Sequence, residues 1–310
     1  MNKGKLLKKG DTIGVVATSS PCNEEKLAKV NELVQLGFHV KIAETCYQNY
    51  GGYLAGTPEA RASEVNAMFA DPEVDAIMCM RGGYGSPQIL PLLDYELIRE
   101  NPKLFIGYSD ITALHSALGQ KANLATVHAF MASVGIMSEV DEFSRDSLLR
   151  AITTPEPLGF IQNPEGEEMQ CLVGGHATGP IVGGNLSLVS ALMGTPYELD
   201  TRGKILFLED IGEEPYRVDR MLTQLALAGK FADAAGILIG TWTNCEPVKY
   251  ENSFEILDVV QNIIVPYNKP TIWNLQAGHG SVNIALPFGV RSTMNASDCT
   301  LFIEESVVDE

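Results

Sequence analysis

Short apolar runs alternate with helical patterns along the first half of the chain. The run TIGVVAT at 12–18 predicts a buried strand, and the apolar spacing after Asn23 predicts a helix that ends at Gly37. Further strands are predicted at 38–42, 76–80 and 104–108, and further helices at 58–70 and 110–118. This alternation is typical of βα units around a parallel sheet.

The alternation of apolar runs and helical patterns is weaker in the second half of the chain. Residues 154–169 are polar and rich in proline, glycine and glutamate, which is typical of a linker. Beyond them the sequence predicts glycine turns at 174–175 and 183–184, strands at 204–208, 236–239 and 270–275, and a helix after Pro215. We therefore predict an α/β fold, with an N-terminal parallel-sheet α/β domain at 1–153, a linker at 154–169 and a smaller β-rich C-terminal domain at 170–310.

The composition of the chain limits the classes of partner that it is expected to bind. The chain has 310 residues, 45% of them hydrophobic, which is enough to bury a full core. Its 39 acidic and 22 basic residues give a net charge of -17, which repels phosphate backbones and anionic lipid. The N-terminal apolar run is too short for a signal peptide, and no run reaches the roughly 20 apolar residues of a membrane span. We expect a cytoplasmic protein that binds neither nucleic acid nor membrane, with its scattered cysteines reduced.

One serine lies where a strand gives way directly to a helix. In FIGYSDIT, at 105–112, Ser109 follows the predicted strand and the helix begins at once. This is the layout of a nucleophile elbow, in which the N–H of the next residue, Asp110, faces a developing oxyanion. The G-x-S-x-G pattern is incomplete here, and a serine at this place can also simply cap the helix.

A nucleophilic serine needs a base and a carboxylate to orient that base. Among the five histidines, His279 lies in a glycine-flanked loop directly after a predicted strand, where a base can approach a neighbouring element. Glu209 and Asp210 end the apolar strand KILFL, and Glu209 is the candidate carboxylate.

The turn RGGYG at 81–85 follows a strand and precedes a helix, so its backbone N–H groups can hold an anion. It is not G-x-G-x-x-G, and the chain shows no Walker pattern and no metal-ligand spacing. The turn can instead supply the second oxyanion donor, because glycine permits close backbone approach.

Taken together, these segments resemble the LD-carboxypeptidase family of serine peptidases. The resemblance rests on ordered motifs across nearly the whole chain: GDTIGVVATSSP, RGGYGS, GYSDITALH, GPIVGGNLSLV, FLEDIGEEPYRVDRML, and GHG followed by LPFG. It implies a catalytic triad of Ser109, Glu209 and His279, with oxyanion N–H donors from Asp110 and from Gly82 or Gly83. It also implies a homodimer and no cofactor or metal.

The resemblance implies a peptide substrate. The expected reaction removes the terminal D-alanine of a muropeptide tetrapeptide in cell-wall recycling, and Arg81 is a candidate cation for the terminal carboxylate. The alternative within the family is a microcin-immunity-type peptidase that cleaves peptidyl-aminoacyl nucleotides. Such members tend to be longer, with an extra aromatic-bearing loop, whereas tryptophan occurs here only at 242 and 273. A non-catalytic peptide-binding protein is the alternative of another class.

Overall fold

The alternating runs of the first half form a sheet with the strand order β13-β6-β5-β4-β2-β3. All neighbours pair in parallel except β13, which runs antiparallel to β6. Its strands are β2 (Thr12–Val16), β3 (His39–Ile42), β4 (Ala76–Cys79), β5 (Leu104–Gly107), β6 (Thr126–His128) and β13 (Leu286–Phe288). Every residue of β4 and β5 is buried, as expected for parallel strands covered on both faces.

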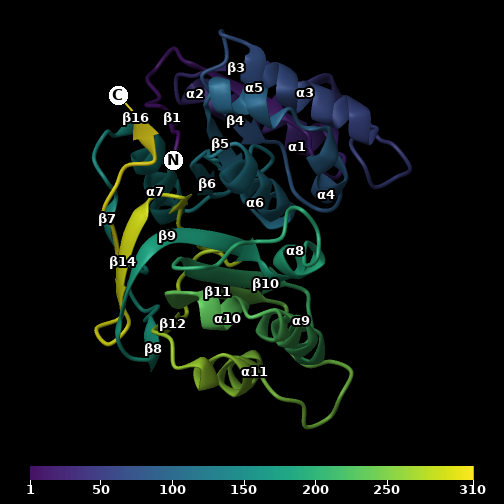
Figure 1. Cartoon of the computed structure of the whole chain (residues 1–310). Coiled ribbons are helices and arrows are strands. Elements are labelled where there is room, and N and C mark those ends of the chain that lie inside the picture. The colour runs from purple at the N-terminus through teal and green to yellow at the C-terminus, as the bar shows by residue number, and fades with distance from the viewer. Residues whose placement is uncertain (310) are drawn as a thin grey trace. The chain divides into compact units, whose positions relative to one another are not determined.

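The computed structural model describes residues 1–309, and it divides into two units. The first unit contains Met1–Pro157, Ala285–Gly289 and the chain from Ser306 onward, and the second contains Leu158–Ile284 and Val290–Glu305. The C-terminal segment of the chain thus belongs to the first unit. In Figure 1, yellow β16 (Val308–Asp309) lies beside purple β1 (Gly4–Lys5), and the two strands pair in parallel. Within residues 154–169, predicted as a linker, Gly159–Ile161 form strand β7.

The helices of the first unit lie mostly where the apolar spacing predicts them. The predicted helix at 58–70 is confirmed as α3 (Pro58–Ala70), where the Thr57 side chain accepts a hydrogen bond from the Ala60 N–H. The single helix predicted up to Gly37 is wrong in part, because it breaks into α1 (Glu24–Ala28) and α2 (Asn31–Gln35). The others are η1 (Glu44–Tyr47), α4 (Ser86–Ile89), η2 (Leu90–Leu92), α5 (Tyr95–Glu100), η3 (Ser109–Ile111), α6 (Thr112–Lys121) and α7 (Glu142–Thr153).

The sheet of the second unit has the order β7-β15-β14-β9-β10-β11-β12-β8. Strands β9 to β12 are parallel, and antiparallel strands flank them on both sides. Besides β7, the strands are β8 (Gln170–Val173), β9 (His176–Asn185), β10 (Ile205–Ile211), β11 (Gly236–Thr243), β12 (Thr271–Trp273), β14 (Arg291–Asn295) and β15 (Thr300–Ile303). The predicted fold class, a parallel-sheet α/β part followed by a further sheet unit, is confirmed.

Helices α8 (Leu186–Ala191), α9 (Pro215–Leu227), α10 (Lys230–Asp233) and α11 (Ile256–Ile263), with η4 (Val265–Tyr267), complete this unit. Its apolar core packs helical side chains such as Leu222 and Val260 against strand side chains such as Leu208 and Ile239. Truncating one such buried side chain to alanine costs about 2–5 kcal/mol, so this core holds β10 and β11 in place. Among residues 1–309, no helix is both long and apolar enough to cross a membrane.

Candidate active site

Ser109 lies at the turn between β5 and the helical segment that begins with η3. Its φ is 66°, in the left-handed region that a residue with a side chain seldom adopts. Such strain persists only where the surroundings enforce it, and it concentrates at functional sites. The predicted strand, serine and helix are therefore found here with the sharp backbone turn of a nucleophile elbow.

The glycine turn at 81–85 borders this serine. A Cβ built on Gly82 would lie 3.0 Å from the Ser109 Cβ and 3.1 Å from its Oγ, so a side chain here would press against the serine. Gly83 has a φ of 111° and faces Ser20 instead. Of the two glycines predicted to supply an oxyanion donor, Gly82 is the one in contact with the serine.

Asp110, the residue after the serine, is buried at 1% exposure. Its Oδ2 accepts hydrogen bonds from Ser19 Oγ at 2.5 Å and from the Ser86 N–H at 2.7 Å. Burial raises the pKa of this carboxyl, and the hydrogen bonds that it accepts oppose that shift. The side chain thus joins the serine turn to the segment after β2 and to the start of α4.

In the second unit, the structure brings Glu209 and His279 together. His279 Nδ1 lies 2.6 Å from Glu209 Oε2, and the Glu209 side chain is fully buried. Burial raises the pKa of Glu209, while the hydrogen bond from His279 opposes that shift. A buried carboxylate on one ring nitrogen fixes the tautomer and orientation of the imidazole, which is what a general base requires.

An irregularity in the sheet separates Glu209 from its acidic neighbour. The register of β10 against β11 shifts between Leu208 and Asp210, as in a β-bulge, a feature often found beside active sites. Asp210 is used structurally, because it accepts hydrogen bonds from Asn185 Nδ2 and from both the N–H and the hydroxyl of Ser187. The Glu209 carboxylate instead contacts the histidine.

The loop that carries His279 is fixed by two side chains that the sequence analysis did not single out. Asn283 Oδ1 accepts a hydrogen bond from the Gly278 N–H at 3.0 Å. Thr241 Oγ1 accepts one from the Gly280 N–H at 3.1 Å and donates one to the Ala277 carbonyl at 3.2 Å. Thr241 belongs to β11, so only the fold brings it to this loop.

The other predicted site residue, Arg81, is half-buried in the first unit. One of its guanidinium nitrogens donates a hydrogen bond to the Pro21 carbonyl at 2.9 Å. Ser109, Asp110, Gly82 and Gly83 belong to the same unit, whereas Glu209 and His279 belong to the second. In residues 1–309, no group of three or more His, Cys, Asp or Glu side chains is placed to hold a metal ion.

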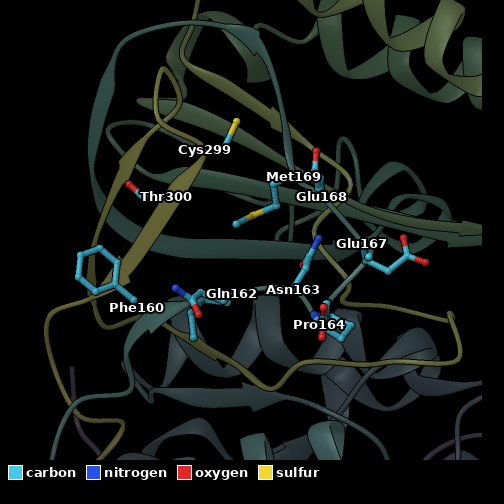
Figure 2. A pocket seen from close by; sticks show the side chains of 12 residues that line it. Phe160, Gln162, Asn163, Pro164, Glu167, Glu168, Met169, Cys299 and Thr300 are labelled. Atoms are coloured by element: carbon cyan, nitrogen blue, oxygen red, sulfur yellow. The ribbon is translucent and has the colours of Figure 1, made fainter.

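The second unit also contains a pocket of about 380 Å³, lined mainly by residues 160–169 (Figure 2). Neither Glu209 nor His279 lines it. Its wall is nevertheless joined to the segment before the histidine loop, because Asn163 Oδ1 accepts from the Gln276 N–H at 2.8 Å and Asn163 Nδ2 donates to the Asn274 carbonyl at 2.6 Å.

Comparison with known families matches both halves of the chain. Residues 13–129 match the LD-carboxypeptidase N-terminal domain, and residues 178–294 match the LD-carboxypeptidase C-terminal domain. The first match contains Ser109 and the glycine turn, and the second contains Glu209 and His279.

Individual relatives each cover more than three quarters of the chain. A Bacillus subtilis (strain 168) protein named probable murein peptide carboxypeptidase is 43% identical over 98% of this chain and 95% of its own. The murein tetrapeptide carboxypeptidase of Pseudomonas aeruginosa is 31% identical over 79% of this chain and 80% of its own. Among solved structures, an MccF-like protein of Bacillus anthracis is 30% identical, with a TM-score of 0.84 over 98% of this chain and 100% of its own.

Proposed function

Because this chain belongs to the LD-carboxypeptidase family of serine peptidases, we propose that it removes the terminal D-alanine from muropeptide tetrapeptides in cell-wall recycling. The observation that carries the proposal is the strained turn at Ser109, with φ of 66° and Gly82 against its hydroxyl. The names of the murein carboxypeptidase relatives support the choice of substrate.

In the proposed mechanism Ser109 Oγ attacks the carbonyl carbon of the bond before D-alanine, and His279 takes the hydroxyl proton. Glu209, hydrogen-bonded to Nδ1, holds the ring so that Nε2 receives that proton and stabilises the imidazolium that forms. The oxyanion accepts hydrogen bonds from the N–H of Asp110 and from that of Gly82 or Gly83.

Collapse of the tetrahedral intermediate breaks the C–N bond, and His279 returns the proton to the departing amine of D-alanine. Water then attacks the acyl-enzyme with the same base and releases the tripeptide. Every step uses side chains and backbone groups of this chain, so the proposal invokes no cofactor.

Mass spectrometry of a muramoyl tetrapeptide ending in D-alanine, incubated with wild type or with Ser109→Ala, tests both the reaction and the nucleophile. We expect the loss of one alanine with wild type alone. Glu209→Gln is expected to lower kcat by roughly 10³–10⁴-fold, because the histidine loses its orienting charge. Unchanged turnover in folded Ser109→Ala would sink the assignment of the nucleophile.

We propose that Arg81 binds the terminal carboxylate of the substrate. Its half-buried position next to Gly82 supports this, since a cation there lies in the same turn that borders the nucleophile. Arg81→Ala is expected to raise KM for a tetrapeptide with a free C-terminal carboxylate and not for its C-terminal amide. An equal change for the two substrates would contradict the role.

Hydrolysis of a peptidyl-aminoacyl nucleotide is the second candidate function. The observation that favours it is the 30% identity to the MccF-like protein. Competition between the two substrates at equal concentration distinguishes the two candidate functions. The muropeptide is expected to have the higher kcat/KM.

We also propose that the protein acts in the cytoplasm as a homodimer. The family resemblance supports the dimer, and a substrate produced by cell-wall recycling supports the compartment. Light scattering after size-exclusion chromatography tests the homodimer, and cell fractionation tests the cytoplasmic location. A monomer, or recovery outside the cytoplasmic fraction, would contradict them.

A further inference from the structure

A buried polar network lies behind the nucleophile turn. It contains Asp110 and three hydroxyl residues: Ser19 Oγ lies 3.0 Å from Ser86 Oγ, and Thr18 Oγ1 lies 3.3 Å from each of these atoms. All four side chains are at most 1% exposed. The network joins the segment after β2, the start of α4 and the first turn after Ser109.

Arg61 reaches the same place from α3 and is fully buried. Its Nη1 donates to the carbonyls of Thr18 and of Gly85, the latter at 3.0 Å, and its Nη2 donates to Gln88 Oε1 at 2.6 Å. Burial lowers the pKa of Arg61, and the negative charge of Asp110 opposes that shift. The guanidinium therefore holds the C-terminal end of the glycine turn and offsets the buried carboxylate.

The last two residues of the glycine turn, and Ser86 directly after it, are held by hydrogen bonds. Ser20 Oγ accepts from the Tyr84 N–H at 3.1 Å, Arg61 holds the Gly85 carbonyl, and Asp110 Oδ2 accepts from the Ser86 N–H at 2.7 Å. One residue, Asp110, thus supplies a proposed oxyanion donor with its backbone and holds the turn of the other donor with its side chain.

We propose that the Asp110 carboxylate, with Arg61 behind it, is a positioning group that fixes the glycine turn against Ser109 and so sets the two oxyanion donors before substrate binds. This rests on the proposed function, in which Ser109 is the nucleophile. Preorganised donors lower the barrier because they need no reorientation as charge develops, and loss of one donor costs roughly 10²–10³-fold in kcat.

The test compares Asp110→Ala with Asp110→Asn. Alanine removes the acceptor for Ser19 and Ser86, so kcat is expected to fall by roughly 10²-fold with KM unchanged, the pattern of an interaction made only in the transition state. Asparagine keeps one acceptor oxygen and is expected to lie between wild type and Asp110→Ala. The control is Asp141→Asn, a carboxylate that caps α7 by accepting from the Ser144 N–H and is expected to leave kcat and KM unchanged.

Thermal melting of each variant establishes how much of it is folded. A folded Asp110→Ala with wild-type kcat would overturn the proposal, as would a fall in kcat no larger than the loss of folded protein. If Asp110→Ala does not fold, Ser19→Ala tests the proposal instead. This variant removes the hydroxyl that donates to the carboxylate at 2.5 Å, and it is expected to lower kcat severalfold with KM unchanged. Wild-type kcat in folded Ser19→Ala would then contradict the proposal.

A fluorophosphonate that labels Ser109 separates this proposal from the function. Its phosphoryl oxygen occupies the oxyanion position, so the labelling rate is expected to fall in Asp110→Ala even if the muropeptide is the wrong substrate. Turnover of muropeptide by wild type with an unchanged labelling rate in Asp110→Ala would reject the positioning role alone.

Discussion

The residue before the candidate base, Gly278, has no room for a side chain. Its φ is 124°, and a Cβ built on it would lie 2.6 Å from Glu209 Oε2 and 2.7 Å from Thr241 Oγ1. A side chain at this position would collide both with the carboxylate that holds the histidine and with the threonine that holds its loop.

Gly278→Ala is therefore expected to lower kcat at least tenfold, because a small misplacement of a catalytic group is costly. Steady-state kinetics and a melting curve measure the effect. Gly229→Ala is the matched control, since Gly229 has a φ of 78° with nothing within 4 Å of its Cβ position. Equal activity losses in the two variants would attribute the effect to backbone strain alone.

The candidate site could be predicted from the sequence where each residue is marked by its neighbours. Ser109 stands between a strand and a helix, and His279 stands between glycines. Thr241 and Asn283 carry no such local mark. Thr241 contacts the histidine loop only when β11 meets that loop, and Asn283 contacts Gly278 only when the loop folds back on itself. Asp110 was predicted for its N–H, and nothing local indicated that its carboxylate binds Ser19 and Ser86.

At the scale of elements, α6 is attached to the end of β5 by a buried histidine. His115 Nε2 lies 2.8 Å from the Gly107 carbonyl, two residues before the nucleophile. Burial lowers the pKa of His115 to about 4, so the ring is neutral in the folded protein and donates this hydrogen bond.

This lowered pKa makes the free energy of unfolding depend on pH. In the unfolded chain the pKa returns to about 6.5, so the unfolded state binds more protons below that value and the free energy of unfolding falls from about pH 6.5 to about pH 4. His115 accounts for on the order of 3 kcal/mol of this fall. His115→Gln keeps an N–H donor without titrating, so denaturant melts at several pH values should show a shallower fall than in wild type.

Of the two glycine turns predicted in the second half, only 174–175 lies between strands, where a turn is possible. The predicted turn at 183–184 is wrong, because both glycines lie within β9. A Cβ on Gly183 would collide with the backbone of Phe207 in the neighbouring strand, so glycine there permits close strand pairing. Glycine is favoured both in tight turns and where two strands approach closely. Only the structure of the neighbouring strand shows which of the two reasons applies.

At the scale of the whole molecule, the first unit is not continuous in sequence. Strand β13 pairs with β6, and Phe288 packs against the rings of His115 and His128. Strand β16 pairs with β1. Late segments of the chain therefore complete two separate sheets that earlier segments begin: β13 joins the six-stranded sheet, and β16 forms a two-stranded sheet with β1.

A fragment ending at Pro157 is expected to fail to fold cooperatively, because it lacks β13 and β16 and exposes the edge of β6. Circular dichroism during heating measures this, with the full chain as the control. A sharp melting transition of the isolated fragment would show that the returning strands are dispensable.

The left-handed backbone at Ser109 lowers the stability of the folded protein at a residue that the proposed reaction requires. A side chain in this region costs roughly 1–2 kcal/mol, a cost that glycine avoids. Ser109→Gly is therefore expected to melt at a higher temperature than wild type while being inactive, whereas Ser109→Ala keeps the strain and is inactive without that gain. Selection for thermal resistance alone would therefore favour glycine at this position, and only a requirement for the serine hydroxyl opposes that replacement.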